Sequence, residues 1–213
     1  MKVKDDELKV ILLGNSGVGK TSLLNATVND TQGQVTKNNK ATIGCYYIQK
    51  PIIINGREIL LNLWDTAGSE TYLGITKLFF KGSDIIILVY DITCAKSFHD
   101  LKNWMKQVDE IVDNRYVCGI VGNKNDLFLN AKVNEQEAKA FAENNNCLFK
   151  LVSAETDRLS FISFLNEITE EYIKKFCNNE CVKKDRRNSI RISKISVEEI
   201  NDINNNNKNN KCC

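Results

Sequence analysis

One segment near the N-terminus constrains the fold more than any other part of the chain. Its sequence, Gly14-Asn15-Ser16-Gly17-Val18-Gly19-Lys20-Thr21, fits the pattern G-x-x-x-x-G-K-[ST]. It follows the apolar run Leu8–Leu13 and leads into a helical segment from about Gly19, which predicts a strand, a glycine-rich turn and a helix. Glycines let the backbone wrap closely around phosphate oxygens, and the N–H groups and helix N-terminus face the phosphates. The segment therefore predicts a P-loop that binds a nucleoside triphosphate, without indicating the base.

Two side chains of this segment are suited to the charge of a bound triphosphate. We expect the Lys20 ammonium to reach the β- and γ-phosphates and the Thr21 hydroxyl to ligate Mg²⁺. The predicted phosphate-binding residues are Asn15, Ser16, Gly17, Val18, Gly19, Lys20, Thr21 and Ser22. The alternative is a fortuitous glycine-rich turn, which average composition would produce in about one chain of this length in a hundred.

Apolar runs alternate with amphipathic segments along most of the chain. This rhythm predicts an α/β fold with a mostly parallel sheet and helices on both faces. Asn55-Gly56, between the runs Cys45–Ile54 and Glu58–Trp64, predicts a hairpin and thus one antiparallel pair. The uninterrupted run Ile85–Tyr90 predicts a buried central strand. Two further strands are expected at Cys118–Gly122 and Leu148–Val152, and helices at Ser97–Val112, Asn134–Asn144 and Phe161–Phe176.

Length and composition indicate one globular domain followed by a tail. The chain has 213 residues, of which 42% are hydrophobic and 26% charged. Its net charge of +2 is too small to indicate nucleic-acid binding. The N-terminus has no apolar segment typical of a secretory signal, so we expect a cytosolic chain. From about Asn178 the sequence becomes weakly apolar and rich in asparagine, which predicts a globular part at 1–177 and a largely disordered tail at 178–213.

A second motif, Asn123-Lys124-Asn125-Asp126, follows the expected strand Cys118–Gly122 and bears on the choice of base. A carboxylate such as that of Asp126 can accept hydrogen bonds from guanine N1–H and the exocyclic amino group together. Adenine offers no such pair of donors, so the carboxylate would lose its partners. The motif is short and weak by itself, but after a P-loop it favours guanine over adenine.

Two more segments, Trp64-Asp65-Thr66-Ala67-Gly68 and Ser153-Ala154, complete a set of motifs with which the chain resembles the Ras superfamily of small GTPases. The resemblance extends from about Leu8 to Phe176. It implies the P-loop NTPase fold of a Ras-like G domain, with a six-stranded, mostly parallel sheet that contains one antiparallel strand. It also implies a GTPase that binds GTP or GDP with Mg²⁺.

The resemblance assigns further roles around the phosphates. It implies that Asp65 holds Mg²⁺ through a water, that the Gly68 amide senses the γ-phosphate, and that Thr42 closes over Mg²⁺ in the triphosphate state. Together with Lys20, Thr42 and Gly68, position 69 completes the implied catalytic set. The family has a glutamine there that orients the attacking water, but this chain has Ser69.

On the side of the base, the resemblance implies that Asn123 ties its loop to the P-loop and that the stem of Lys124 packs against the guanine. The Ala154 amide would contact the guanine oxygen, within a loop that also contains Ser153 and Glu155. Glu155 stands where the family more often has lysine, at a position that acts mainly through its backbone.

Two departures from the family lead to kinetic predictions. Serine is too short to replace the glutamine at position 69, so we predict slow hydrolysis and a long-lived GTP state. The segment Asn29–Ala41 lacks the aromatic residue that stacks on guanine, so we predict fast nucleotide release. The alternative is a GTP-loaded or nucleotide-loose scaffold without meaningful hydrolysis. A P-loop ATPase or kinase is disfavoured by Asp126.

Within the superfamily the chain is most similar to Rab proteins. The similar segments are Thr42-Ile43-Gly44, Leu78-Phe79-Phe80-Lys81-Gly82 and Ile86–Thr93. The resemblance implies a regulator of vesicle traffic that works with effectors, an exchange factor, a GTPase-activating protein, an escort protein and a GDP-dissociation inhibitor. It places Tyr47, Trp64 and Phe80 on an effector-binding surface, although all three could be packing residues instead.

The chain ends in Lys211-Cys212-Cys213, which resembles the Rab signal for two geranylgeranyl groups. One lipid gives only marginal membrane binding, whereas two give stable anchoring. The resemblance therefore implies lipidation at Cys212 and Cys213 and residence in the cytoplasm and on the cytoplasmic face of an intracellular membrane.

Overall fold

The structure, a computed structural model, describes residues 7–28, 45–66, 80–112 and 115–177. The chain divides into two compact units, Met1–Tyr172 and Ile173–Cys213. In the second unit the described part is a single π-helical turn, η4 (Ile173–Cys177). The proposed tail at 178–213 lies outside the described residues, so the predicted boundary after residue 177 stays a prediction.

Six strands of the first unit form one sheet in the order β2-β3-β1-β4-β5-β6. The hairpin strands β2 and β3 pair antiparallel, and all other neighbours pair parallel. The sheet confirms the predicted fold class. The strands are β1 (Glu7–Leu13), β2 (Cys45–Ile54), β3 (Arg57–Thr66), β4 (Ile85–Asp91), β5 (Val117–Asn123) and β6 (Leu148–Leu151).

The predicted hairpin turn forms at Asn55 and Gly56, whose φ angles are +51° and +77°. A two-residue type I′ turn matches the twist of the paired strands, and it needs positive φ at both central residues. Asn and Gly adopt positive φ at little steric cost.

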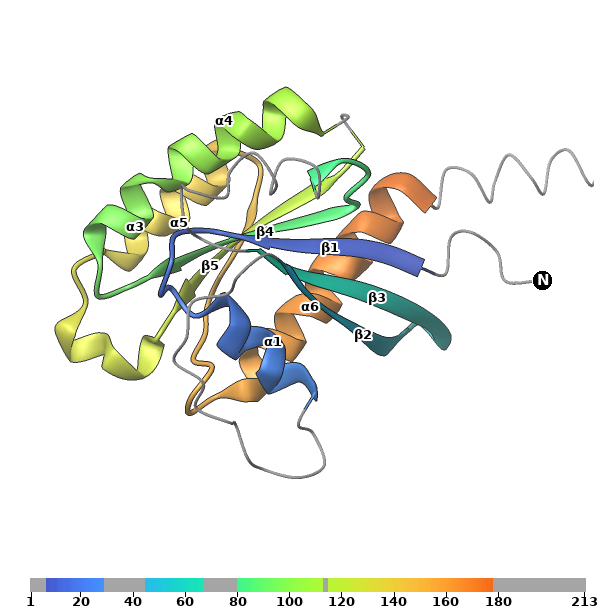
Figure 1. The fold of residues 1–213 in the computed structure, drawn as a ribbon, viewed down its shortest axis with the longest axis horizontal. Helices are drawn as coiled ribbons and strands as arrows, with labels where there is room; N and C mark the ends of the chain where they lie inside the picture. The colour runs from blue at the N-terminus through green and yellow to red at the C-terminus, as the bar shows by residue number, and fades with distance from the viewer. Residues whose placement is uncertain (1–6, 29–44, 67–79, 113–114, 178–213) are drawn as a thin grey trace, which may run out of the picture. The chain divides into compact units, whose positions relative to one another are not determined.

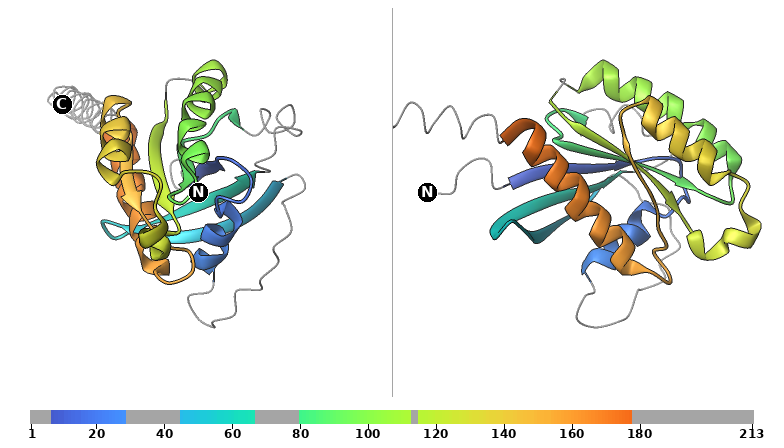
Figure 2. Two further views of the ribbon diagram at one scale, coloured as in Figure 1. Left: turned by 90° about the vertical axis from the view of Figure 1, so that its left-hand side faces the viewer. Right: turned by 180° about the vertical axis from the view of Figure 1, so that it is seen from behind.

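Helices cover both faces of the sheet, as Figure 1 shows and the view from behind in Figure 2 supports. One face carries α3, α4 and α5, which pack on the side chains of β4 and β5. The other carries α1 and α6, where Gly119 of β5 leaves room for Phe164 of α6. The helices are α1 (Lys20–Val28), α3 (Ala95–His99), α4 (Leu101–Ile111), α5 (Glu135–Asn144) and α6 (Arg158–Tyr172), with a 3-10 helix, η3 (Asn125–Asn130).

The helix predicted at Ser97–Val112 is two helices that meet at Asp100. Asp100 keeps near-helical angles, φ −70° and ψ −12°, and its carbonyl accepts hydrogen bonds from the N–H groups of both Asn103 and Trp104. The apolar spacing runs across this junction almost unchanged, so periodicity alone predicts one continuous helix.

The parallel register brings the motifs to one edge of the sheet. Leu12 of β1 pairs with Asp65 of β3, and Asp91 of β4 pairs with Asn123 of β5. The P-loop follows β1 directly at the same edge. Ligands of open α/β sheets bind outside these carboxyl ends of the strands.

Among the described residues, no helix is long and apolar enough to cross a lipid bilayer.

Candidate nucleotide site

The loop from Gly14 to Gly19 fits closely against two neighbouring strands. Gly14 has φ +142°, and a Cβ there would lie 2.1 Å from the carbonyl oxygen of Val89 on β4. Gly19 has φ +98°, and its Cβ would lie 2.2 Å from the side-chain nitrogen of Asn123 on β5. A side chain at either position would collide with the end of β4 or β5, so both positions require glycine.

Lys20 is buried at the start of α1 and turns back onto the loop. Its ammonium donates to the carbonyl oxygens of Gly14 at 2.7 Å and Asn15 at 3.0 Å. Burial lowers the pKa of Lys20 to about 8, against the opposing influence of the Asp65 carboxylate. The ammonium is thus held inside the curve of the loop, where it faces any anion that the loop binds. Of the other predicted phosphate-binding residues, Val18 is buried, and Ser16, Gly17 and Ser22 are exposed.

Thr21 and Asp65 meet at the end of β3. The Thr21 hydroxyl donates a hydrogen bond to Asp65, whose side chain is fully buried. Hydroxyl and carboxylate oxygens are the hard donors that suit Mg²⁺. The described residues hold no cluster of three or more His, Cys, Asp or Glu side chains suited to a metal. Mg²⁺ usually takes one or two protein ligands and completes its shell with phosphates and water, so the two oxygens of Thr21 and Asp65 suit it.

Asn123 joins three loops at the end of β5. Its side-chain nitrogen donates to the carbonyl oxygen of Val18 in the P-loop at 2.9 Å, and its side-chain oxygen accepts from the Ala154 N–H at 3.2 Å. The Asn123 side chain is 1% exposed, and its bond to Val18 is buried. The P-loop and the loop after β6 are therefore both fixed to the second motif.

Asp126 is exposed and is oriented by a buried neighbour. The Ser153 hydroxyl donates to one Asp126 carboxylate oxygen at 2.5 Å and accepts the Thr156 N–H at 3.0 Å and the Glu155 N–H at 3.3 Å. Ser153 is 3% exposed. Its hydroxyl thus links the carboxylate to the backbone of the loop after β6, while Glu155 itself points an exposed side chain outward.

Lys124 has a partner that the sequence analysis did not find. Its backbone is left-handed, with φ +68°, and its ammonium lies 2.6 Å from a carboxylate oxygen of Asp91. Asp91 also accepts from the backbone N–H and hydroxyl of Thr93. Burial raises the pKa of Asp91, but these hydrogen bonds outweigh it and hold the pKa below its usual value. A carboxylate at the end of the buried strand β4 was the available signal for this residue.

Several predicted residues lie outside the described part of the chain. They are Thr42, Gly68, Ser69, Cys212 and Cys213. Their roles therefore rest on the sequence alone.

Of the three aromatic residues predicted to form an effector surface, Tyr47 of β2 and Trp64 of β3 lie next to one another, and their role in effector binding stays a prediction. Tyr47 is 41% exposed and its ring centroid lies 4.8 Å from that of the partly buried Trp64. Phe80, in contrast, is 0% exposed and packs in the core with Ile11 and Leu88. The prediction that Phe80 belongs to the surface is wrong, because its side chain is fully enclosed in the core cluster.

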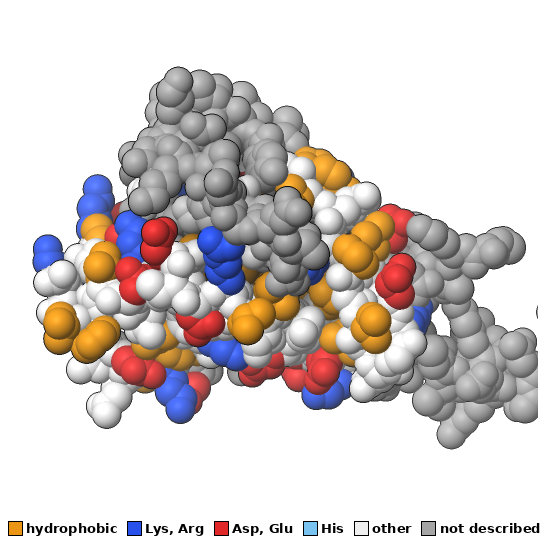
Figure 3. All heavy atoms as spheres, turned by 90° about the horizontal axis from the view of Figure 1, so that it is seen from below, with side chains coloured by type: hydrophobic (Ala, Val, Ile, Leu, Met, Phe, Trp, Pro, Cys, Tyr) orange, Lys and Arg blue, Asp and Glu red, His pale blue; other side chains and the backbone are white. Residues whose placement is uncertain are grey.

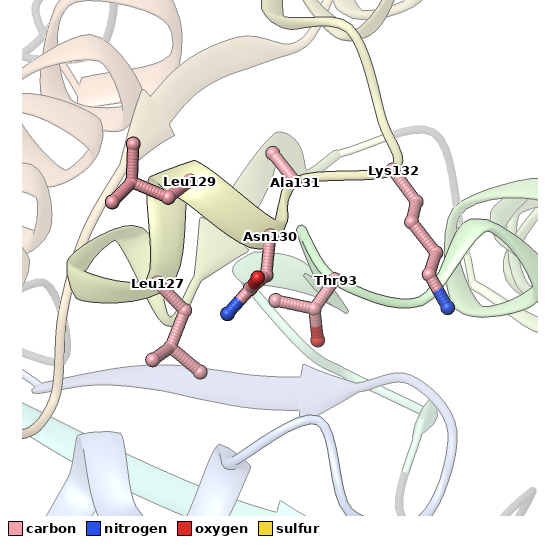
Figure 4. A pocket seen from close by; sticks show the side chains of 6 residues that line it. All are labelled: Thr93, Leu127, Leu129, Asn130, Ala131 and Lys132. Carbon is pink, nitrogen blue, oxygen red and sulfur yellow. The ribbon is translucent and has the colours of Figure 1, made fainter.

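Hollows on the described surface also lie away from this site, one of them between Phe98 and Phe141. A hollow beside η3 is lined by Thr93, Leu127, Leu129, Asn130, Ala131 and Lys132 (Figure 4). No P-loop or base-motif residue named above lines it, so we assign no nucleotide to it. On the face in Figure 3, acidic and basic side chains alternate and hydrophobic ones form small patches on the described part.

The fold and the joined loops define a P-loop G domain, and comparison with known proteins agrees. A model of the Ras family matches residues 9–174. Human Ras-related protein Rab-30 is 37% identical over 154 residues, which cover 72% of this chain and 74% of the relative. Ras-related protein rab-11.1 of Caenorhabditis elegans is 35% identical over 191 residues, or 88% of each chain. GTP-binding protein ypt3 of Schizosaccharomyces pombe is 38% identical over 146 residues, or 68% of this chain and 67% of the relative.

These matches cover most of the chain at more than 30% identity. The chain therefore belongs to the Rab family of small GTPases.

Proposed function

We propose that this Rab-family protein is a guanine-nucleotide switch that alternates between GTP-bound and GDP-bound states and regulates vesicle traffic. The observation that carries the proposal is the double hydrogen bond of Asn123 to Val18 and Ala154. It joins the loop that is shaped for phosphate to the two loops that are suited to guanine, so one ligand can span all three.

In this proposal the phosphates lie along the N–H groups of residues 15–19 and against Lys20. The residues that would hold Mg²⁺ are Thr21, Asp65 through a water and, in the triphosphate state, Thr42. When bound, the ion neutralises charge that develops on the phosphate oxygens. Thr21 and Asp65 already contact one another, so both oxygens lie together before any ligand binds.

Asp126 selects the base. Ser153 orients its carboxylate, and the exposed side chain can accept the N1–H and amino hydrogens of guanine. Lys124, anchored to Asp91, would extend its stem along the base, and the Ala154 N–H, which donates to Asn123 in this structure, would be shared with the guanine oxygen. An adenine base would leave the carboxylate without these donors.

Hydrolysis of the γ-phosphate is proposed to be slow. The reaction depends on a residue that positions the attacking water, and Ser69 is shorter than the glutamine that resemblance leads one to expect. A second candidate function, a GTP-loaded or nucleotide-loose scaffold that binds effectors without meaningful hydrolysis, is favoured by the same serine. Lys20, Thr21, Thr42 and Asp65 favour retained binding of GTP with Mg²⁺, which a nucleotide-loose scaffold would lack.

The output of the switch is proposed to be effector binding through residues that include Tyr47 and Trp64. An exchange factor, a GTPase-activating protein, an escort protein and a GDP-dissociation inhibitor are proposed regulators. Prenyl groups on Cys212 and Cys213 would hold the protein on the cytoplasmic face of an intracellular membrane, with a free pool in the cytoplasm.

The test is the nucleotide that copurifies with the full chain, followed by titration with GDP, GTP and ATP in Mg²⁺. We expect saturable binding of guanine nucleotides and at least about a hundredfold weaker binding of ATP. A copurifying adenine nucleotide, or preference for ATP, would contradict the switch. Copurified GTP that persists through a long incubation with Mg²⁺ would favour the scaffold.

A further inference from the structure

The side chain of Asn15, in the P-loop, is held at both ends by the junction of α3 and α4. Its nitrogen donates to a carboxylate oxygen of Asp100 at 2.6 Å. Its oxygen accepts the indole N–H of Trp104 at 3.0 Å. These partners lie 85 and 89 residues further along the chain.

The arrangement fixes the orientation of the Asn15 amide. Trp104 is 4% exposed, so its indole N–H needs an acceptor within the protein. Rotating the Asn15 amide by half a turn would place its N–H₂ against the indole donor and its oxygen against the Asp100 carboxylate. Each end of the amide therefore has only one partner that suits it.

The same residue also contributes to the position of Lys20. The backbone oxygen of Asn15 accepts from the Lys20 ammonium at 3.0 Å, next to the Gly14 oxygen at 2.7 Å. A displacement of Asn15 thus moves a carbonyl that holds the ammonium. Asp100 is well placed to act on it, because its backbone forms the junction between the two helices.

We infer that Asn15, Asp100 and Trp104 form a positioning unit that holds the P-loop in its phosphate-binding shape and so sets how long a bound guanine nucleotide stays. The inference rests on the proposed function. Asp100 and Trp104 act through Asn15 and do not contact the nucleotide themselves. Movement of the α3–α4 junction would therefore change nucleotide residence at a site that lies on a different element.

The donor and acceptor of the Asn15–Asp100 pair can be exchanged, which gives a sharp test. Asn15→Asp places a second carboxylate opposite Asp100 and replaces a hydrogen bond by repulsion. Adding Asp100→Asn supplies a new N–H₂ donor on the other side, and the charge of the pair returns to that of the wild type. The indole N–H of Trp104 keeps an oxygen acceptor throughout.

The measurement is the dissociation rate of fluorescent GDP, chased with unlabelled GDP in Mg²⁺. We expect Asn15→Asp to release GDP about tenfold faster, a typical coupling for residues in direct contact. The double variant should release it within about threefold of the wild type. Trp104→Phe, which keeps an aromatic side chain but replaces the indole by a smaller ring without the N–H, should speed release several-fold because it leaves the Asn15 oxygen without its donor.

Asp109→Asn is the matched control, since Asp109 is also on α4 but accepts from Tyr116 rather than from the P-loop. Combined with Asn15→Asp, it should give no rescue. A double variant with Asp100→Asn that is no slower than Asn15→Asp alone would overturn the inference and leave the proposed function intact. A wild type without saturable guanine-nucleotide binding would overturn both.

Discussion

The Lys124 ammonium lies 2.6 Å from an Asp91 carboxylate oxygen, so the base motif is joined to the end of β4. Lys124 takes a left-handed backbone, with φ +68°, which costs about 1–2 kcal/mol for a residue with a side chain. The ion pair and the bonds from Thr93 compensate by holding the turn in one conformation. The loop that carries the base motif is thus held by a side chain of β4, Asp91, as well as by Asn123 of β5.

This ion pair predicts an acid-dependent contribution to stability. In the folded protein the pKa of Asp91 lies below its ordinary value of 3.8. The ionised carboxylate therefore stabilises the fold fully at pH values above 3.8, and this stabilisation is lost as the pH falls through the folded-state pKa. We expect Asp91→Asn to lower the free energy of unfolding by about 1–3 kcal/mol near pH 7. Urea unfolding from about pH 6 to pH 3 should show this difference shrink. Asp109→Asn, on an exposed aspartate, serves as the control; a constant difference at all pH values would contradict the assignment.

Two glycines of the P-loop should differ in their tolerance of a methyl group. Gly14 and Gly17 both have positive φ, but a Cβ at Gly14 would lie 2.1 Å from a backbone oxygen, whereas one at Gly17 would meet nothing within 4 Å. Gly17→Ala should therefore cost only the strain, about 1–2 kcal/mol, and Gly14→Ala about 3–5 kcal/mol. Urea unfolding of the nucleotide-free proteins measures both. Equal costs would show that the loop is not pressed against Val89.

The burial of Phe80 predicts a different separation, between stability and binding. Phe80→Ala should lower the free energy of unfolding by about 3–5 kcal/mol, as for other aromatic residues removed from a core. Tyr47→Ala removes an exposed ring and should cost about 1 kcal/mol, while weakening any effector that binds the Tyr47–Trp64 surface. Thermal unfolding measures the stability of each variant, and capture of the GTP-loaded protein by an effector measures its binding. If Phe80→Ala has the same free energy of unfolding as the wild type, the assignment of Phe80 to the core is wrong.

The sequence predicted local features well and distant pairs poorly. The P-loop and the Asn55-Gly56 turn follow from short segments whose conformational needs are local, whereas the strand order was not predicted. Asn15 with Asp100, and Lys124 with Asp91, pair only after the sheet has aligned the ends of its strands. The burial of Phe80 could not be predicted either, because residues 78–80 are all apolar. Such a run has no apolar–polar pattern that shows which side chain faces the core.

The role of Asp126 in the choice of base can be tested by a substitution that keeps its hydrogen bond with Ser153. In Asp126→Asn the amide oxygen can still accept the Ser153 hydroxyl, which now contacts the carboxylate at 2.5 Å. The amide nitrogen would face the guanine amino group, donor against donor, but would suit the carbonyl that xanthine carries at the same position. We expect GDP affinity to fall by about a hundredfold and XDP affinity to rise. Titrations of both nucleotides with wild type and variant measure this, and an unchanged preference for GDP would exclude Asp126 from base recognition.

Hydrolysis provides the last prediction, because Ser69 is the residue that separates a slow switch from a scaffold. Ser69→Gln restores a side chain long enough to orient water, and it should raise the single-turnover rate of bound GTP about tenfold or more, since this chemistry depends on positioning. GDP affinity should not change, because the diphosphate lacks the group beside which that water acts. Lys20→Ala in the same background is the control and should abolish the gain through loss of phosphate binding. If Ser69→Gln hydrolyses GTP no faster, with or without an activating protein, the serine does not limit the reaction, and the scaffold becomes the better description.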